Sequence, residues 1–258
     1  MSVRDIHLRV PDSCRPRGAR DHDKSPLTES IEEYVEGIWR LEQVVPTVGT
    51  GEIAQYMGVA PPSVTTMLKR MAELGLVEHI PYQGVRCTEK GEALAIELLR
   101  KHRLIERLLV DFLELPWEGV HDLACKLEHY ISSDVADRIA AAMGSPQTCP
   151  HGNPVDATRE DFSVQLSALE PGDRARVAKI TDEREEFLRY LLEIGLLPGA
   201  QIEAVSRTPF GDVLTLKVEG RDSPVAVGTE VMTSLWVHAG YSDPSPEGSV
   251  EAAGDPRT

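Results

Sequence analysis

Four residues between positions 121 and 129 have the types and the spacing of a metal site. His121, Cys125, Glu128 and His129 are separated by four, three and one positions, so on a helix they project to nearly one side over two turns. Thiolate, carboxylate and imidazole groups are ligands of first-row divalent metals. Crowding them together without a cation would leave polar groups competing for water. The spacing therefore predicts a divalent-cation site.

Two further pairs of candidate ligands precede this group. His102 and Glu106 are spaced i, i+4, and Glu33 and Glu36 are spaced i, i+3, so each pair shares one helix face. A lone histidine is more often a packing or surface residue, and a solvated face is the better interpretation of the two glutamates taken alone. Pairs on three successive helices nevertheless make metal binding the favoured prediction.

The elements that must position these residues begin with the pattern of a winged helix. Apolar residues recur at helical spacing over residues 27–45. Residues 50–59 predict a short helix and residues 61–74 a second one, with prolines between them and a glycine after them. Residues 76–88 alternate between apolar and polar types around a Gln-Gly turn, as a small hairpin does. Helix, turn, helix and hairpin in this order are typical of a winged helix.

One face of the second of these helices could read DNA, because it presents short hydroxyls and two cations opposite its apolar side. Hydroxyls near a helix N-terminus can reach phosphates or base edges, while lysine and arginine anchor the DNA backbone. A solvated face is the alternative, but the wing that follows favours DNA recognition, with more dependence on DNA shape than on direct base contacts. The predicted DNA-binding residues are Thr50, Pro62, Ser63, Thr65, Thr66, Lys69, Arg70 and Gln83.

The second half of the chain predicts a helical region and then a small β-barrel. Long helical patterns start at residue 90 and again over 120–143, and they are more apolar than a lone helical pair requires, which favours a dimer interface. The proline-rich and glycine-rich stretch 145–161 indicates a linker. Short strands over residues 174–180, 202–205, 213–218 and 224–227, with a helix over 185–194 among them, indicate the barrel.

The composition limits the class of protein. The 258 residues are 41% hydrophobic, enough for two or three domains. Without an apolar run of roughly 20 residues or an apolar signal core, we expect a cytoplasmic protein with free or metal-bound cysteines instead of a disulfide framework. The net charge of -15 disfavours DNA binding unless basic groups cluster and bound cations neutralise carboxylates.

Three segments of the sequence resemble the diphtheria toxin repressor family. They are Glu33 to Trp39 (EYVEGIW), Arg100 to Leu109 (RKHRLIERLL) and Val120 to His129 (VHDLACKLEH), within a similarity that spans about residues 27–155. The β-rich part after it resembles the SH3-like domain, of the ferrous-transport-A type, found in the longer members of that family. The resemblance therefore covers most of the chain.

This resemblance implies a homodimeric repressor that binds double-stranded operator DNA when loaded with Mn(II) or Fe(II), two ions per subunit, and controls metal uptake and storage. By position, the primary site comprises Glu33, Glu36, Cys125, Glu128 and His129, and the ancillary site comprises His102, Glu106 and His121. The iron-sensing branch adds an acid and an amide from the barrel. Asp182 and Glu185 are the nearest match here, and Glu183 and Glu186 compete with them.

The identity of the metal depends on Glu33, where the iron-sensing branch has a methionine and the manganese-sensing branch an acid. A carboxylate in place of a thioether favours Mn(II), whereas the retained Cys125 thiolate favours Fe(II) or later metals. Taken together, the two residues slightly favour manganese.

Two rival functions are a zinc metalloenzyme and a winged-helix regulator gated by an organic ligand. The sequence shows neither a catalytic base nor a substrate pocket, so we expect no enzyme.

The expected fold is mainly α with a small β part: an N-terminal winged helix-turn-helix, a helical dimerisation domain and a C-terminal SH3-like β-barrel. We divide the chain into a disordered tail over residues 1–25, a DNA-binding domain over 26–95, a helical metal-binding and dimerisation domain over 96–150, a linker over 151–164, the SH3-like domain over 165–240 and a second disordered tail over 241–258.

Overall fold

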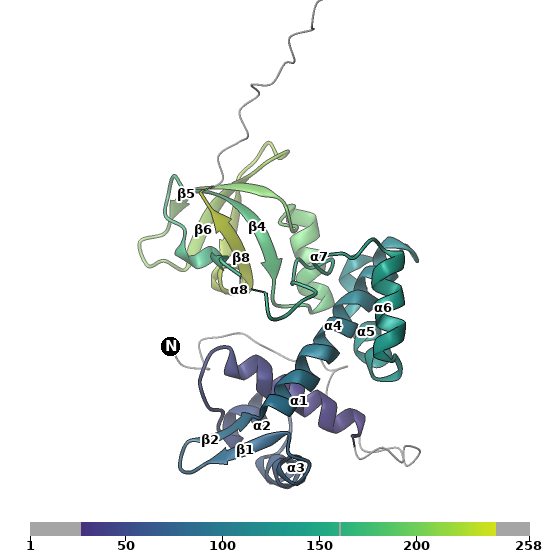
Figure 1. Cartoon of the computed structure of the whole chain (residues 1–258). Coiled ribbons are helices and arrows are strands. Elements are labelled where there is room, and N and C mark those ends of the chain that lie inside the picture. The colour runs from purple at the N-terminus through teal and green to yellow at the C-terminus, as the bar shows by residue number, and fades with distance from the viewer. Residues whose placement is uncertain (1–26, 160, 241–258) are drawn as a thin grey trace, which may run out of the picture.

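The computed structural model describes residues 27–159 and 161–240, and both predicted tails lie outside these residues. Figure 1 shows the winged helix at the bottom, a helical part at the right and a barrel at the top, with α4 running from the first into the second. The expected fold class is thereby confirmed. Among the described residues, no helix is long and apolar enough to cross a membrane.

The winged helix is built around one apolar core. Its elements are α1 (Glu29–Glu42), α2 (Thr50–Met57), α3 (Pro61–Glu73), β1 (Val77–Ile80) and β2 (Gly84–Cys87). Ile31, Ile38 and Leu68 are among the fully buried residues that join α1 to the helix-turn-helix. The wing is fixed to the start of α2 through Val48 and Val85, whose backbones exchange two hydrogen bonds. The predicted DNA-binding residues of α3 and the wing are thus attached to one common core.

The helical part consists of α4 (Glu89–Asp111), α5 (His121–Leu127), a 3₁₀ turn (Glu128–Tyr130) and α6 (Ser133–Ala142). The single helix predicted over 120–143 is therefore wrong. Ile131 adopts an extended backbone, and the Ser132 side chain caps α6 by accepting a hydrogen bond from the Val135 amide at 3.4 Å. Because of this break, Glu128 and His129 lie on a tight turn that faces both α4 and α1.

The barrel is a six-stranded sheet with the order β3-β8-β4-β5-β6-β7. Its elements are β3 (Val164–Gln165), β4 (Arg174–Ile180), α7 (Glu185–Ile194), β5 (Gln201–Arg207), β6 (Val213–Val218), β7 (Val225–Gly228), α8 (Thr229–Ser234) and β8 (Leu235–Ala239). Strands β4 and β6 and helix α7 lie where the sequence predicts them, while β3, α8 and β8 were not predicted. The apolar face of α7 packs into the barrel core through Leu188 and Leu191.

Residues 147–155, which we name the junction loop, lie between the helical part and the barrel. Arg103 and Arg107 of α4 donate hydrogen bonds to the carbonyls of Pro154 and Thr148, at 2.5 and 3.0 Å. Gly152 has a φ of 86°, and a Cβ atom there would lie 2.1 Å from the Ala178 carbonyl of β4. The stretch connects the two parts, as a linker does, but this portion of it is packed against both.

Candidate metal centre

Four side chains from three parts of the fold converge at the junction. His102 and Glu106 come from α4, His121 from α5, and Glu183 from the loop before α7, each with one ligand atom within 4.8 Å of the others. The i, i+4 spacing on α4 places His102 and Glu106 on the face that α5 covers. The predicted ancillary residues are thus brought together, and the barrel adds a second carboxylate to them.

Glu106 is the centre of this cluster and is fully buried. Its Oε1 lies 3.1 Å from His102 Nε2, 3.5 Å from His121 Nδ1 and 3.2 Å from Nδ1 of His151. Neither Glu106 oxygen has a hydrogen-bond partner, nor does Nδ1 of His151. Orphaned buried polar atoms are costly, and three imidazoles around one carboxylate are a suitable donor set for a divalent metal. The residues therefore fit the implied ion.

The junction loop supplies two further candidate ligands that sequence reasoning missed. Cys149 and His151 form a group with Glu106 and Glu183 in which the ligand atoms again lie within 4.8 Å of one another. His151 is held by its Nε2, which lies 2.9 Å from the Trp117 carbonyl, so its Nδ1 faces the cluster. The sequence did contain a signal for these ligands, because Cys149 and His151 are two positions apart in a segment rich in proline and glycine. That segment was interpreted only as a linker.

The barrel residue at the centre is Glu183, not Asp182 or Glu185. Glu183 Oε2 lies 2.7 Å from His121 Nδ1. Asp182 is buried against Arg184, and Glu185 is exposed and paired with Arg189, so neither carboxylate reaches the cluster. Glu183 directly precedes the turn into α7, and its Oε1 accepts a hydrogen bond from Asn153 of the junction loop at 2.8 Å.

The electrostatics of the cluster depend on imidazole and carboxylate charges that compensate each other. Burial acts to lower the pKa of His102 and His151, but the Glu106 carboxylate outweighs it and raises both pKa values well above the ordinary range. Burial and Glu106 act to raise the pKa of Glu183, yet His121 and His151 lower it to about 2. The imidazoles therefore favour their protonated forms, whose positive charge balances the carboxylates. A divalent cation could supply this positive charge instead.

The predicted primary residues are less closely gathered. Glu128 Oε2 lies 2.6 Å from His102 Nδ1, and Glu128 Oε1 lies 3.7 Å from His129 Nε2, so Glu128 stands between the two predicted sites. The α1 carboxylate nearest to His129 is that of Glu32, at 2.6 Å from Nδ1, which the sequence did not single out. Glu33 has a buried Oε2 without a hydrogen-bond partner, and burial raises its pKa to about 7 despite His129.

Cys125 and Glu36 are engaged with other groups. Cys125 Sγ lies 3.5 Å from His121 Nε2 and is disulfide-bonded, whereas Cys87 and Cys149 are free. A disulfide sulfur is not a thiolate, and metal binding through Cys125 therefore requires its reduction. Glu36 is paired with Arg40 on its own helix.

Most of the predicted DNA-binding residues are exposed on the winged helix. Pro62, Ser63, Thr65, Thr66, Lys69 and Arg70 are exposed on α3, Gln83 is exposed in the wing, and Thr50 begins α2. The hydroxyls of Thr65 and Thr66 donate back to the helix at 3.2 and 3.1 Å. Within the described part of the chain, no carboxylate pairs with Lys69 or Arg70. Both cations are therefore available to phosphates.

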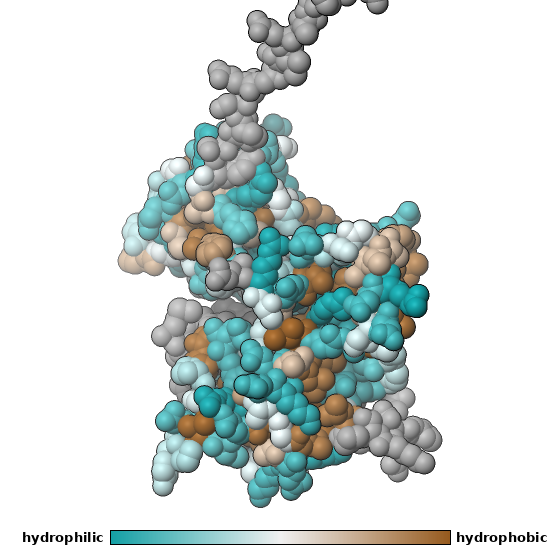
Figure 2. All heavy atoms as spheres, viewed as in Figure 1, coloured by the Kyte–Doolittle hydropathy of each residue, from teal (hydrophilic) through white to brown (hydrophobic). Residues whose placement is uncertain are grey.

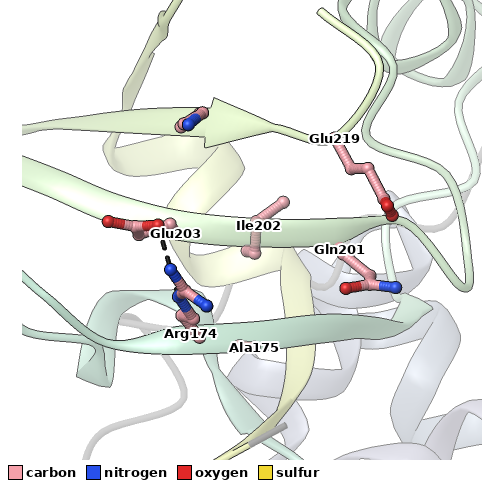
Figure 3. Close-up of a pocket in the computed structure, with 7 residues that line it drawn as sticks. Arg174, Ala175, Gln201, Ile202, Glu203 and Glu219 are labelled. Carbon is pink, nitrogen blue, oxygen red and sulfur yellow. Dashed lines mark ion pairs between the residues drawn. The ribbon is translucent and has the colours of Figure 1, made fainter. Parts of the chain in front are cut away.

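A shallow hollow on the barrel is the place where an organic ligand could lie. It has a volume of about 230 Å³, and its lining includes the apolar residues Ala175 and Ile202. Figure 3 shows Arg174 and Glu203 side by side across it, paired at 3.3 Å. The Arg174 and Glu203 side chains thus neutralise each other on the sheet itself. Nothing in this hollow connects it to the winged helix.

Several large apolar side chains are exposed on the helical part. Figure 2 shows brown and tan spheres over this part at the right of the molecule. They include Phe112, Leu113, Leu115, Leu123, Leu127 and Val135, which are between 36% and 60% exposed. An apolar surface of this kind is typical of an interface between protein chains.

Three family models match consecutive parts of the chain. They describe the N-terminal DNA-binding domain of iron-dependent repressors over residues 26–85, the metal-binding and dimerisation domain of iron-dependent repressors over 88–156, and the FeoA domain over 164–239. The three matches follow the winged helix, the helical part and the barrel.

Relatives and solved structures agree with these matches. The iron-dependent repressor IdeR of Mycobacterium tuberculosis is 34% identical over 213 residues, covering 76% of this chain and 92% of the relative. The diphtheria toxin repressor of Corynebacterium diphtheriae is 30% identical, with the same coverage of 76% and 92%. A structure of a manganese-dependent transcriptional repressor in complex with manganese is 31% identical, with a TM-score of 0.74 over 80% of this chain and 98% of that one. The chain therefore belongs to the family of metal-dependent repressors that includes the diphtheria toxin repressor.

Proposed function

We propose that this protein is a transcriptional repressor of metal-homeostasis genes that binds operator DNA when Mn(II) or Fe(II) occupies its metal centre. The observation that carries the proposal is Glu106, a fully buried carboxylate whose Oε1 lies within 3.5 Å of nitrogens of three imidazoles. The named functions of its relatives, iron-dependent and manganese-dependent repression, support the same conclusion. The protein acts in the cytoplasm, where its DNA is.

Two ions per subunit would be held by different residues. His102, Glu106, His121, His151 and Glu183 would hold the ancillary ion. Cys149 is a further candidate there. The primary ion would be held by Cys125 in its reduced form, Glu128, His129 and a carboxylate of α1. Each bound ion neutralises carboxylates and fixes side chains that come from different elements.

The residues of α1 connect the metal to DNA binding. α1 packs against α2 and against α4, and its Glu32 contacts His129 in the 3₁₀ turn of the helical part. A cation between α1 and the 3₁₀ turn would fix the winged helix relative to the helical part. In a homodimer, this fixes two reading helices at the separation of successive major grooves, roughly 34 Å or a multiple.

Manganese is the favoured ion, because the α1 ligand is a carboxylate and the ancillary donors are mainly nitrogen and oxygen. The thiols of Cys125 and Cys149 leave Fe(II) as the competitor. The alternative of an organic ligand is less well supported, because the hollow described on the barrel is lined in part by the Arg174–Glu203 ion pair and contains none of the candidate metal ligands. A zinc hydrolase would need a base and a substrate cavity beside the cluster.

The test is DNA binding by the full chain under anaerobic, reducing conditions. A duplex selected from random sequences in the presence of Mn²⁺ should be bound with Mn²⁺ or Fe²⁺ and released by a chelator. Glu106→Gln should weaken metal-dependent binding at least about tenfold, whereas Glu185→Gln, on the exposed face of α7, should not. DNA binding that persists with chelator would overturn the proposal, and so would metal-dependent hydrolase activity without DNA binding.

A further inference from the structure

The pair of Glu36 and Arg40 on α1 is nearly closed off from solvent. Arg40 donates hydrogen bonds from Nε and Nη2 to the same Glu36 oxygen, at 2.9 and 2.7 Å. The two side chains are only 14% and 25% exposed. An arginine cannot lose its proton in a protein, so Glu36 has a permanent cationic partner.

This pair lies beside the metal centre. Glu36 is one helical turn beyond Glu32 and Glu33, so all three carboxylates lie toward the same side of α1. The charge of Glu36 raises the pKa of Glu128, and the imidazole charges of His102 and His129 act in turn on Glu36. Glu36 therefore lies on the side of α1 that carries the candidate ligands, and its charge interacts with the candidate ligands of the other helices.

The charge of Arg40 interacts with groups of α2 and of the barrel as well as with Glu36. Glu36, Tyr56 of α2 and Glu183 are the groups whose charge acts on it to raise its pKa, against the effect of burial. Glu36 itself has a lowered pKa, because Arg40 outweighs the burial that acts to raise it. The guanidinium is thus held by Glu36 and interacts electrostatically with the Glu183 carboxylate of the barrel as well.

We propose that Arg40 is a specificity-determining residue of the metal centre: it holds Glu36 in an internal ion pair and so withholds this carboxylate from metal binding. The inference rests on the proposed function, since it concerns which carboxylates reach the ion. A metal that took Glu36 would leave the guanidinium partly buried without a counter-charge, which is unfavourable. Arg40 thereby limits the contribution of α1 to Glu32 and Glu33.

The alternative is that the pair only packs α1 against α2 near Tyr56. The two roles differ in what happens when Arg40 is removed and the carboxylate stays. If Arg40 withholds a ligand, the released Glu36 becomes a new donor, and the metal content or affinity rises. If Arg40 only supports packing, its loss lowers stability without any gain in metal binding.

The test counts Mn²⁺ bound to the reduced full chain by equilibrium dialysis, with electron paramagnetic resonance to detect spin coupling between neighbouring ions. Arg40→Gln should bind one more Mn²⁺ per subunit, or bind its Mn²⁺ at least about tenfold more tightly. The double variant Glu36→Gln/Arg40→Gln should return to the wild-type values, because the released carboxylate is gone.

Two variants keep the inference testable if Arg40→Gln fails to fold. Glu36→Gln alone should keep the wild-type metal content, and loss of an ion from it would overturn the inference. Arg40→Lys retains the cation and should also bind as wild type does. Equal Mn²⁺ binding by Arg40→Gln, the double variant and the wild type would also overturn it. A wild-type chain that binds no Mn²⁺ or Fe²⁺ would instead refute the proposed function.

Discussion

At the scale of the residue, the candidate metal centre is a buried cluster of imidazoles and carboxylates whose charges compensate one another. Three buried imidazoles face the Glu106 and Glu183 carboxylates at distances from 2.7 to 3.6 Å. Without an ion, protons on the imidazoles compensate the carboxylates. Metal binding requires neutral imidazoles, so each ion that enters must displace protons.

This exchange predicts opposite pH dependences with and without metal. The pKa values of His102, His121 and His151 are raised in the folded chain, because the carboxylates outweigh burial. Their protonated forms therefore stabilise the fold fully below about pH 6.5, and this contribution is lost as the pH rises through the folded pKa values. We expect the metal-free unfolding free energy to fall by about 1 kcal/mol or more between roughly pH 6 and 8.5.

The measurement is denaturant unfolding at both pH values, with a chelator and with Mn²⁺. The stabilisation by Mn²⁺ should grow with pH, because fewer protons compete for the ligands. Glu106→Gln removes the carboxylate that raises two of the pKa values, so it should flatten the metal-free slope. A metal-free chain that becomes more stable over this range would contradict the charge balance described above.

A second residue-scale prediction separates neighbouring acids of the barrel. Glu183→Gln should remove one bound Mn²⁺ per subunit or weaken it at least about tenfold, because Glu183 lies 2.7 Å from His121. Asp182→Asn tests the adjacent carboxylate, which contacts Arg184 instead. Calorimetric titration with Mn²⁺ distinguishes them. If Asp182→Asn loses an ion and Glu183→Gln does not, the assignment of the barrel ligand is wrong.

The sequence predicts ligands well where helical periodicity fixes their direction, as for His102 and Glu106. The sequence does not predict ligands whose side-chain direction is fixed by a loop. Cys149 and His151 lie in a stretch without periodicity, and Gly152 and the Trp117 carbonyl, which orient His151, become neighbours only in the folded chain. Glu183 was left in competition with its neighbours because a turn, not a helix, decides which acid points inward.

At the scale of the element, α4 is the support of both the DNA-binding head and the metal centre. Its first turn is capped by Thr88, whose hydroxyl accepts from the Gly91 amide at 3.2 Å. Gly91 lies so close to the connection after α3 that a Cβ atom would be 2.0 Å from the Leu76 carbonyl oxygen. The close approach fixes the start of α4 against the segment that joins α3 to the wing.

Glycine-to-alanine changes in two helices should therefore have opposite effects. Alanine is the better helix former, so Gly51→Ala in α2, with open space around it, should stabilise the chain by up to about 1 kcal/mol. Gly91→Ala should instead destabilise it by about 1–3 kcal/mol, because the backbone of Leu76 must move. Equilibrium unfolding measures both. Stabilisation by Gly91→Ala would show that the approach of α4 is looser than described.

The elements themselves could largely be predicted from periodicity. β4, β6 and α7 end where apolar patterns end, and α4 lies within one residue of its predicted start. The break at Ile131 and Ser132 was missed, since apolar spacing continues across it while the backbone turns. The strand β8 was missed because its pairing with β3 and β4 joins distant parts of the sequence.

At the scale of the whole molecule, the exposed apolar side chains of the helical part are the surface that a second subunit would cover. The matched dimerisation domain spans residues 88–156, and Leu123 and Leu127 lie within it on α5, at 38% and 36% exposed. Burial of several such side chains stabilises an interface by roughly 25 cal/mol per Å² of apolar area.

Charge introduced on this surface should dissociate the dimer. The double change Leu123→Glu/Leu127→Glu is expected to raise the dimer dissociation constant at least about a hundredfold, since two carboxylates would be desolvated. Analytical ultracentrifugation and circular dichroism should show folded monomers that bind DNA weakly. Leu192→Glu on α7, at 42% exposed in the wild type, is the matched control and should remain dimeric. An unchanged mass for the double variant would place the interface elsewhere.

The junction loop has a consequence for how such a chain can evolve. The loop carries Cys149 and His151, and the barrel that it leads into carries Glu183, so the third part of the chain is an inseparable portion of the metal centre. An ancestor without the barrel would have had to satisfy Glu106 by other residues or by solvent. Gain or loss of the barrel would therefore add or remove the Glu183 carboxylate beside Glu106, so the coordination chemistry constrains modular shuffling of this domain.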